Sequence, residues 1–88
     1  MKVVIIYRPN SEHGRLTEEF IHDYQTRYPM QRIETLNIDS RDGSATATLY
    51  DIVQYPGILV IQNDGQIQKS WVGDSLPRVD EVAGYAHL

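Results

Sequence analysis

The four consecutive apolar residues Ile58 to Ile61 constrain the fold more than any other part of the chain. They stand between Tyr55-Pro56 and the turn sequence Asn63-Asp64-Gly65. An uninterrupted apolar run of this length is typical of a strand buried on both faces in the middle of a sheet. Proline cannot donate a ladder hydrogen bond, so we expect Pro56 at the first position of this strand. The Tyr55–Pro56 bond is also a candidate for the cis isomer.

A second apolar run, Val3 to Ile6, predicts another central strand over residues 2–7, adjacent to the first. Mixed patterns of apolar and polar residues predict strands nearer the edges at 32–38 and 66–72. Helices are expected at 12–28, at 44–53 and after residue 75. The resulting order is β-α-β-α-β-β-α. Its first β-α-β unit is expected to be parallel, and its last two strands are expected to form a hairpin around residues 63–65.

Each predicted helix carries an apolar stripe that should face the core. The expected buried residues are Leu16, Phe20, Ile21, Tyr24 and Tyr28 in the first helix, Ala45, Leu49, Ile52 and Val53 in the second, and Val79, Val82, Ala83 and Ala86 in the third. Asn10 or Ser11 should cap the first helix and Asp74 or Ser75 the third, with Pro77 in its first turn.

Composition excludes several functions. The chain of 88 residues has no cysteine, which rules out disulfides, thiolate catalysis, Cys-ligated zinc and iron–sulfur clusters. A net charge of −4 argues against nucleic-acid or anionic-membrane partners. No apolar run approaches the roughly 20 residues that span a bilayer, and residues 3–6 are too short for a signal sequence. By default we expect a cytoplasmic protein.

Neither a metal site nor a cofactor is expected. His13, His22 and His87 lie on different predicted elements, and Glu12 is adjacent to His13 rather than three or four residues away on a helix. The glycines form no phosphate-binding loop.

Four strings, in their order and spacing, resemble the thioredoxin-like fold. They are Leu36-Asn37-Ile38-Asp39, Asp51-Ile52-Val53-Gln54-Tyr55-Pro56, Val60-Ile61-Gln62-Asn63-Asp64-Gly65 and Trp71-Val72-Gly73. The loop Asn10-Ser11-Glu12-His13 also resembles that of a small group of cysteine-free thioredoxin-like proteins. The resemblance implies a single α/β domain over residues 1–88, with a four-stranded mixed sheet in the order 2-1-3-4 and helices on both faces.

The chain departs from this family at the centre of its chemistry. Thioredoxins carry Cys-x-x-Cys at the start of the first helix, where this chain has Ser11-Glu12-His13-Gly14. A serine hydroxyl is scarcely ionised at neutral pH and forms no disulfide, so this chain alone cannot carry out dithiol–disulfide exchange. We therefore expect a binding protein rather than an enzyme, and assign no catalytic residue.

The resemblance also implies where a ligand would bind. Relatives use the backbone before the cis-proline to hold an extended peptide or glutathione as a short extra strand. The backbone of Tyr55 would then hold the ligand's main chain, and Ser11 with nearby N–H groups its polar end. The candidate residues are Pro9, Asn10, Ser11, Glu12, His13, Gly14, Tyr55 and Pro56.

Most of these residues also have a plain structural interpretation. Ser11 could simply cap the first helix, Glu12 complement its dipole and His13 serve as a polar surface residue. Tyr55 could line the groove or belong to the core. Trp71, outside the candidate site, is expected to cover the sheet edge rather than anchor a partner.

Three functions remain open at this point. The first is a redox-inactive module that binds a peptide or protein partner. The second is an enzyme using glutathione, in which the hydroxyl of Tyr7 or Ser11 stabilises a bound thiolate. The third is a purely structural or subunit role.

Overall fold

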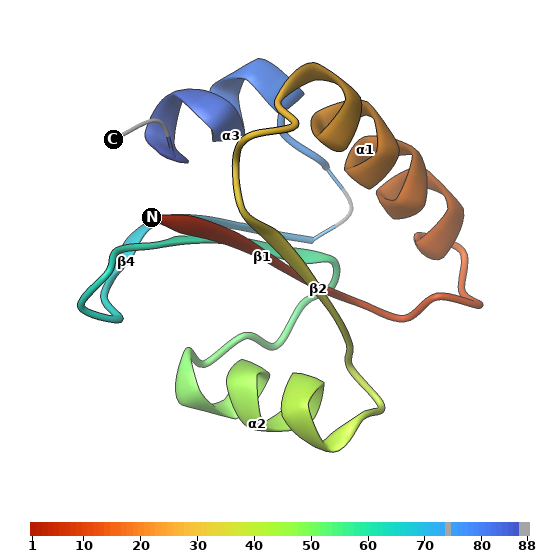
Figure 1. Ribbon diagram of the computed structural model, residues 1–88. Coiled ribbons are helices and arrows are strands. Elements are labelled where there is room, and N and C mark those ends of the chain that lie inside the picture. Colours follow the sequence, from red (N-terminus) through yellow and green to blue (C-terminus); the bar gives the residue numbers. More distant parts are fainter. Residues whose placement is uncertain (74, 87–88) are drawn as a thin grey trace.

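The computed structural model describes residues 1–73 and 75–86, and its architecture is that of a four-stranded sheet between two helical layers (Figure 1). The elements are β1 (Lys2–Tyr7), α1 (Gly14–Arg27), β2 (Ile33–Asn37), α2 (Arg41–Leu49), β3 (Gly57–Ile61), β4 (Ile67–Val72) and α3 (Val79–Ala86). The strand order is β2-β1-β3-β4. This confirms the predicted element order and sheet order.

The two apolar strands, β1 and β3, are the central pair of the sheet. They run antiparallel, with Ile5 opposite Ile58, while β2 runs parallel to β1 and β4 antiparallel to β3. Every residue of β3 is buried. The turn Asn63-Asp64-Gly65 joins β3 to β4 as predicted, and Gly65 takes the positive φ of 89° that such a turn requires.

Alternate residues of β1 contribute to two separate cores, because side chains along a strand point to opposite faces. Val3 and Ile5 belong to the larger core under α1 and α3, and Val4 and Ile6 to the smaller core over α2. Figure 1 shows α1 and α3 on one side of the sheet and α2 on the other. The double burial of the apolar runs is thus explained by helices on both faces.

The larger core contains Phe20 and Tyr24 of α1, as predicted, but not Leu16. The side chain of Leu16 is 57% exposed, because the buried stripe of α1 passes through Gly14 and Thr17 on either side of it. The four predicted inner residues of α3, Val79, Val82, Ala83 and Ala86, are all buried. Ser75 and Pro77 precede α3, and Asp74, the other predicted cap, lies outside the described residues.

The second helix begins and ends earlier than predicted. Its N-cap is Ser40, whose Oγ accepts the N–H of Gly43 at 3.0 Å, so the helix spans Arg41–Leu49 instead of 44–53. This shift rotates the buried face onto Gly43 and Ala47. The predicted inner residues Ala45, Leu49 and Val53 are exposed, and Ile52 is buried from the loop after the helix.

No helix in the described part of the chain is long and apolar enough to cross a membrane.

Candidate functional site

Pro56 stands directly before β3, at the point where the sheet meets the loop that precedes α1. The Tyr55–Pro56 peptide bond is cis, and the ring of Pro56 is buried. Its C=O accepts the N–H of Gly73 at 3.1 Å, which ties this corner to the end of β4. The proline therefore precedes the strand by one residue and does not occupy its first position.

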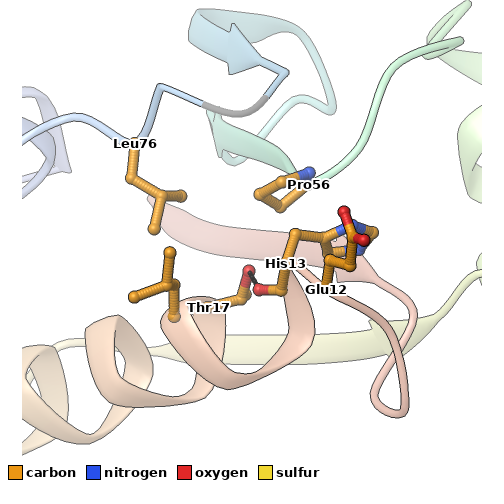
Figure 2. A pocket seen from close by; sticks show the side chains of 6 residues that line it. Glu12, His13, Thr17, Pro56 and Leu76 are labelled. Atoms are coloured by element: carbon orange, nitrogen blue, oxygen red, sulfur yellow. Dashed lines mark hydrogen bonds between the residues drawn. The ribbon is translucent and has the colours of Figure 1, made fainter.

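A pocket of about 140 Å³ opens beside this proline. Its lining residues are Glu12, His13, Leu16, Thr17, Pro56 and Leu76. Figure 2 shows Glu12 and His13 together on one side of the pocket and Leu76 on the other. Three of the eight candidate residues, Glu12, His13 and Pro56, are thus brought together as the resemblance implied.

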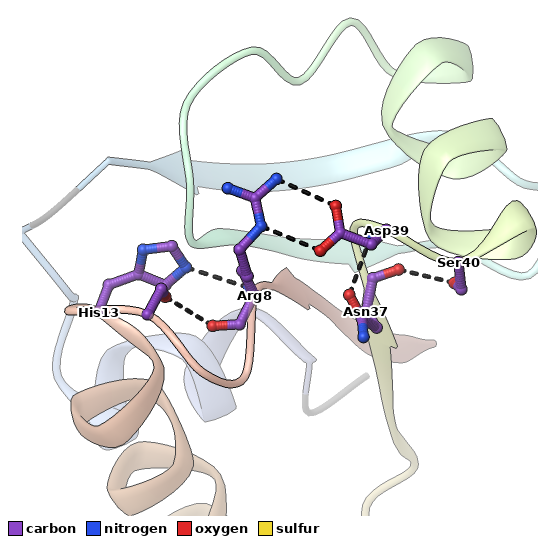
Figure 3. A network of polar contacts seen from close by, with 6 residues as sticks. Arg8, His13, Asn37, Asp39 and Ser40 are labelled. Carbon is purple, nitrogen blue, oxygen red and sulfur yellow. Dashed lines mark hydrogen bonds and ion pairs between the residues drawn. The ribbon is translucent and has the colours of Figure 1, made fainter.

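The turn from Arg8 to His13 is held by its own hydrogen bonds (Figure 3). The backbone N–H of Arg8 donates to Nε2 of His13 at 3.1 Å, and the hydroxyl of Ser11 donates to the C=O of Arg8 at 2.6 Å. The N–H of Gly14 donates to the C=O of Ser11 at 3.1 Å. These bonds fix the backbone that carries Glu12 and His13 to the pocket.

Ser11 and His13 both differ from their plain structural interpretations. α1 begins at Gly14, two residues later than predicted, so Ser11 lies in the preceding turn and does not cap the helix. The N-cap is His13, whose side chain makes no capping bond. It is a half-buried acceptor and not a free surface group. Its Nε2 is the atom that accepts the N–H of Arg8.

Gly14 packs against the loop before α1 and does not line the pocket. It is buried, and a Cβ at this position would lie 2.1 Å from the carbonyl oxygen of Pro9. Only glycine allows the first turn of α1 to approach the loop so closely. Pro9, Asn10 and Ser11 do not line the pocket, although they form the turn beside it.

An ion pair that the sequence did not single out joins this turn to the loop before α2. The guanidinium of Arg8 donates from Nε and Nη2 to the two carboxylate oxygens of Asp39, each at 3.0 Å (Figure 3). These hydrogen bonds hold the pKa of Asp39 below its ordinary value. Asn37 Oδ1 in turn accepts the backbone N–H of Asp39 at 2.8 Å, which holds the backbone of this loop.

The side chain of Tyr55 packs on the opposite face of the sheet from the pocket. It lies against the smaller core, and its hydroxyl donates to the C=O of Ile52 at 3.1 Å. The backbone of Tyr55 is different, since neither its N–H nor its C=O is hydrogen-bonded to another described residue. Beside Pro56 the chain therefore carries a backbone donor and an acceptor that have no partner among residues 1–73 and 75–86.

Sequence reasoning missed three residues that line the pocket: Leu16, Thr17 and Leu76. Leu16 was assigned to the core by its spacing, and Leu76 lies in the loop before α3. Thr17 is fully buried and donates to the C=O of His13 at 2.7 Å. The sequence signal that could have pointed to Thr17 is its position as a polar residue next to the apolar stripe of the helix.

Both hydroxyls considered for thiolate stabilisation already donate to protein groups. Tyr7 donates to the carboxylate of Glu18 at 3.1 Å, and Ser11 donates to the C=O of Arg8. Burial, together with the hydrogen bond to Glu18, raises the pKa of Tyr7. A hydroxyl has a single proton to donate, so neither group can serve a bound sulfur without first breaking its present bond.

Trp71 covers the edge of the sheet, in line with its expected role. It is half-buried against the larger core and packs edge-to-face on Tyr85, with ring centroids 5.6 Å apart. The amine of Lys69 lies 5.9 Å from the Trp71 ring centroid.

Comparison with known proteins identifies the fold. No family model matches the chain, and no curated protein matches it in sequence. Thioredoxin O2 of Arabidopsis thaliana superimposes with a TM-score of 0.75 at 18% identity, over 94% of this chain and 71% of that one. Thioredoxin 1 of Thermosipho africanus gives 0.71 at 10% identity, over 99% and 91% of the two chains. Mitochondrial thioredoxin 3 of Saccharomyces cerevisiae gives 0.71 at 16% identity, over 98% and 76%.

The protein therefore has the thioredoxin-like fold, as the sequence strings indicated, and it has no cysteine. At these identities the likeness concerns the fold, and the function has to be argued from the site.

Proposed function

We propose that this chain is a redox-inactive thioredoxin-like protein that binds a peptide segment of a partner in the groove beside Pro56. The observation that carries the proposal is the backbone of Tyr55, which has no partner in the described part of the chain and lies next to a partly apolar pocket. An extended segment could pair its main chain with the N–H and C=O of Tyr55 and place one side chain in the pocket.

The two parts of this site would contribute differently to binding. Main-chain hydrogen bonds to Tyr55 would give affinity that depends little on sequence, while the pocket selects the side chain. Burying one Leu-sized side chain contributes roughly 1.5–3 kcal/mol. Leu16 and Leu76 would supply much of the apolar contact.

The same scaffold gives no support for redox chemistry within the chain. Without a cysteine there is no thiolate to attack a disulfide and no mixed disulfide to form. The glutathione-using enzyme is not favoured either, because the hydroxyls of Tyr7 and Ser11 each already donate a hydrogen bond to another protein group. We therefore retain the binding function alone.

Selection from a displayed library of random heptapeptides would test the proposal. Wild type should enrich a set of related peptides, and Leu16→Glu should fail to retain them, because a carboxylate would then stand in the apolar wall. Leu16 is 57% exposed, so the variant should fold. The control is His22→Glu, which introduces the same acid at an exposed position of the same helix away from the pocket. This variant should bind the peptides as wild type does.

Two results would contradict the proposal. One is a selection that yields no enrichment over the starting library. The other is a set of enriched peptides that bind Leu16→Glu as well as wild type. Calorimetric heat with millimolar glutathione, lost in Ser11→Ala, would favour the enzyme instead.

A further inference from the structure

Glu12 is a charged group at the pocket that has no partner in the described part of the chain. Its side chain is exposed and lines the pocket, and it makes no hydrogen bond or ion pair with another described residue. The neighbouring bases are already paired. Arg8 is held by Asp39 at 3.0 Å and Arg15 by Glu19 at 3.6 Å.

His13 is not paired with this carboxylate. Its Nε2 accepts the N–H of Arg8, and no hydrogen bond or ion pair joins it to Glu12. In the described part of the chain, the rim of the pocket therefore carries the carboxylate of Glu12 without a paired base, on a chain whose net charge is −4. A base on a bound segment would be attracted to Glu12, and an acid in the same place would be repelled.

The rest of the lining sets the size of the side chain that enters. Leu16, Pro56 and Leu76 supply apolar surface around a volume of about 140 Å³. An apolar cavity of about 150 Å³ holds a molecule the size of benzene. One Leu-sized side chain therefore matches the pocket.

The backbone geometry of an extended segment fixes the spacing between these two groups. Residues two apart on a strand point to the same face, whereas immediate neighbours point to opposite faces. We infer that the bound segment presents a Leu-sized apolar side chain to the pocket and a Lys or Arg, two positions away, to Glu12. This inference rests on the proposed function and adds to it the chemical class of the partner.

Three capped pentapeptides would test the inference in amide-shift titrations of the 15N-labelled protein. The probe is acetyl-Lys-Ser-Leu-Ser-Lys-amide, which offers a base two positions from Leu in either chain direction. Its comparators replace both Lys with Glu, or Leu with Ala. We expect shifts at Glu12, His13 and Leu76 with the probe, and binding weaker by about two- to fivefold or more with the Glu peptide, the range of an exposed ion pair.

Two charge-removing variants make the test specific. Glu12→Gln should bind the Lys and Glu peptides about equally. Asp64→Asn, in the turn at the other end of β3, should keep the wild-type preference. Its Oδ1 can still accept the N–H of Gln66, so the turn should be preserved. The preference of wild type should also shrink as salt is added, because exposed charges are screened.

The outcomes separate the two proposals. The inference fails, and peptide binding stands, if the Lys and Glu peptides shift the amide signals of the pocket residues equally. It also fails if the library peptides that wild type retains lack a base two positions from an apolar residue. A preference that survives in Glu12→Gln also overturns it. If no probe and no library peptide shifts the pocket residues, the proposed function itself fails, and the inference fails with it.

Discussion

The backbone N–H of Arg8 donates to Nε2 of His13 across 3.1 Å, and this bond closes the turn that leads from β1 into α1. A side chain at the pocket thereby holds the end of a central strand. Arg8 also reaches Asp39 through its guanidinium, so one residue joins the candidate site to the loop before α2.

Removing the imidazole should open this turn. We expect His13→Ala to lower the free energy of unfolding by about 1 kcal/mol, the cost of a typical lost hydrogen bond. Hydrogen exchange followed by NMR should show the amide of Arg8 exchanging faster than in wild type. His22→Ala on the exposed face of α1 should leave that amide unchanged, and equal exchange in both variants would contradict the assigned bond.

Two glycine substitutions should change the free energy of unfolding in opposite directions. In Gly14→Ala the new Cβ would lie 2.1 Å from the carbonyl oxygen of Pro9, so the loop must move, and we expect a loss of about 2 kcal/mol or more. In Gly84→Ala the Cβ meets nothing within 4 Å, and helix α3 should gain about 0.5–1 kcal/mol. Urea unfolding measures both, and a neutral Gly14→Ala would rule out the close approach.

The Arg8–Asp39 pair should make a small contribution to stability that disappears in acid. Hydrogen bonds from Arg8 hold the pKa of Asp39 below its ordinary value, so the folded state binds that proton less readily than the unfolded chain. The contribution is present above the ordinary value and is lost as pH falls through the lowered pKa. Asp39→Asn should therefore be less stable than wild type at about pH 7 and should converge with it in acid. In an Arg8→Gln background the substitution should have no such effect.

Buried tyrosine should limit stability at high pH. Burial raises the pKa of Tyr24 from its ordinary value of 10.0 to about 12. Between these values the unfolded chain releases the phenol proton and the folded protein keeps it, so stability falls as pH rises across the interval. Tyr24→Phe should flatten this decline in urea midpoints, although it also removes the hydrogen bond to Gln31. If the stability of the variant falls with pH as steeply as that of wild type, the loss of stability comes from other groups with a raised pKa, such as Tyr7 or Tyr28.

The central strands could be predicted because their burial leaves an uninterrupted local pattern. Val3 to Ile6 and Ile58 to Ile61 are apolar at every position, and only a sheet covered on both faces buries such runs. The edge positions of β2 and β4 followed from their mixed patterns. These features depend on residues adjacent in sequence.

The second helix could not be placed correctly from its apolar residues. Leu49 and Val53 have helical spacing with Ile52 but are 74% and 78% exposed, because Ser40 starts the helix earlier than the apolar pattern suggests. Position 43, in the first turn of this helix, also requires glycine, since a Cβ there would lie 1.9 Å from the carbonyl oxygen of Asn37. That constraint comes from the loop after β2 and is visible only in three dimensions.

The sequence predicted some of the residues that line the pocket and missed others, and the difference has a physical cause. Glu12, His13 and Pro56 meet at the pocket because the fold brings the start of α1 to the start of β3. Leu16 and Leu76 complete the pocket through packing between α1 and the segment before α3, which no local pattern reports. The sequence allows Tyr55 in either the groove or the core, and its side chain lies against the smaller core on the far face of the sheet.

Hydrogen exchange at the amide of Tyr55 tests the central claim most directly. We predict that this amide, which donates to no described residue, becomes protected when the Lys-Ser-Leu-Ser-Lys peptide or a library peptide is bound, because it then donates to the peptide backbone. Protection that appears elsewhere, for example along the free edge of β4, while Tyr55 exchanges as before, would contradict a peptide groove beside Pro56.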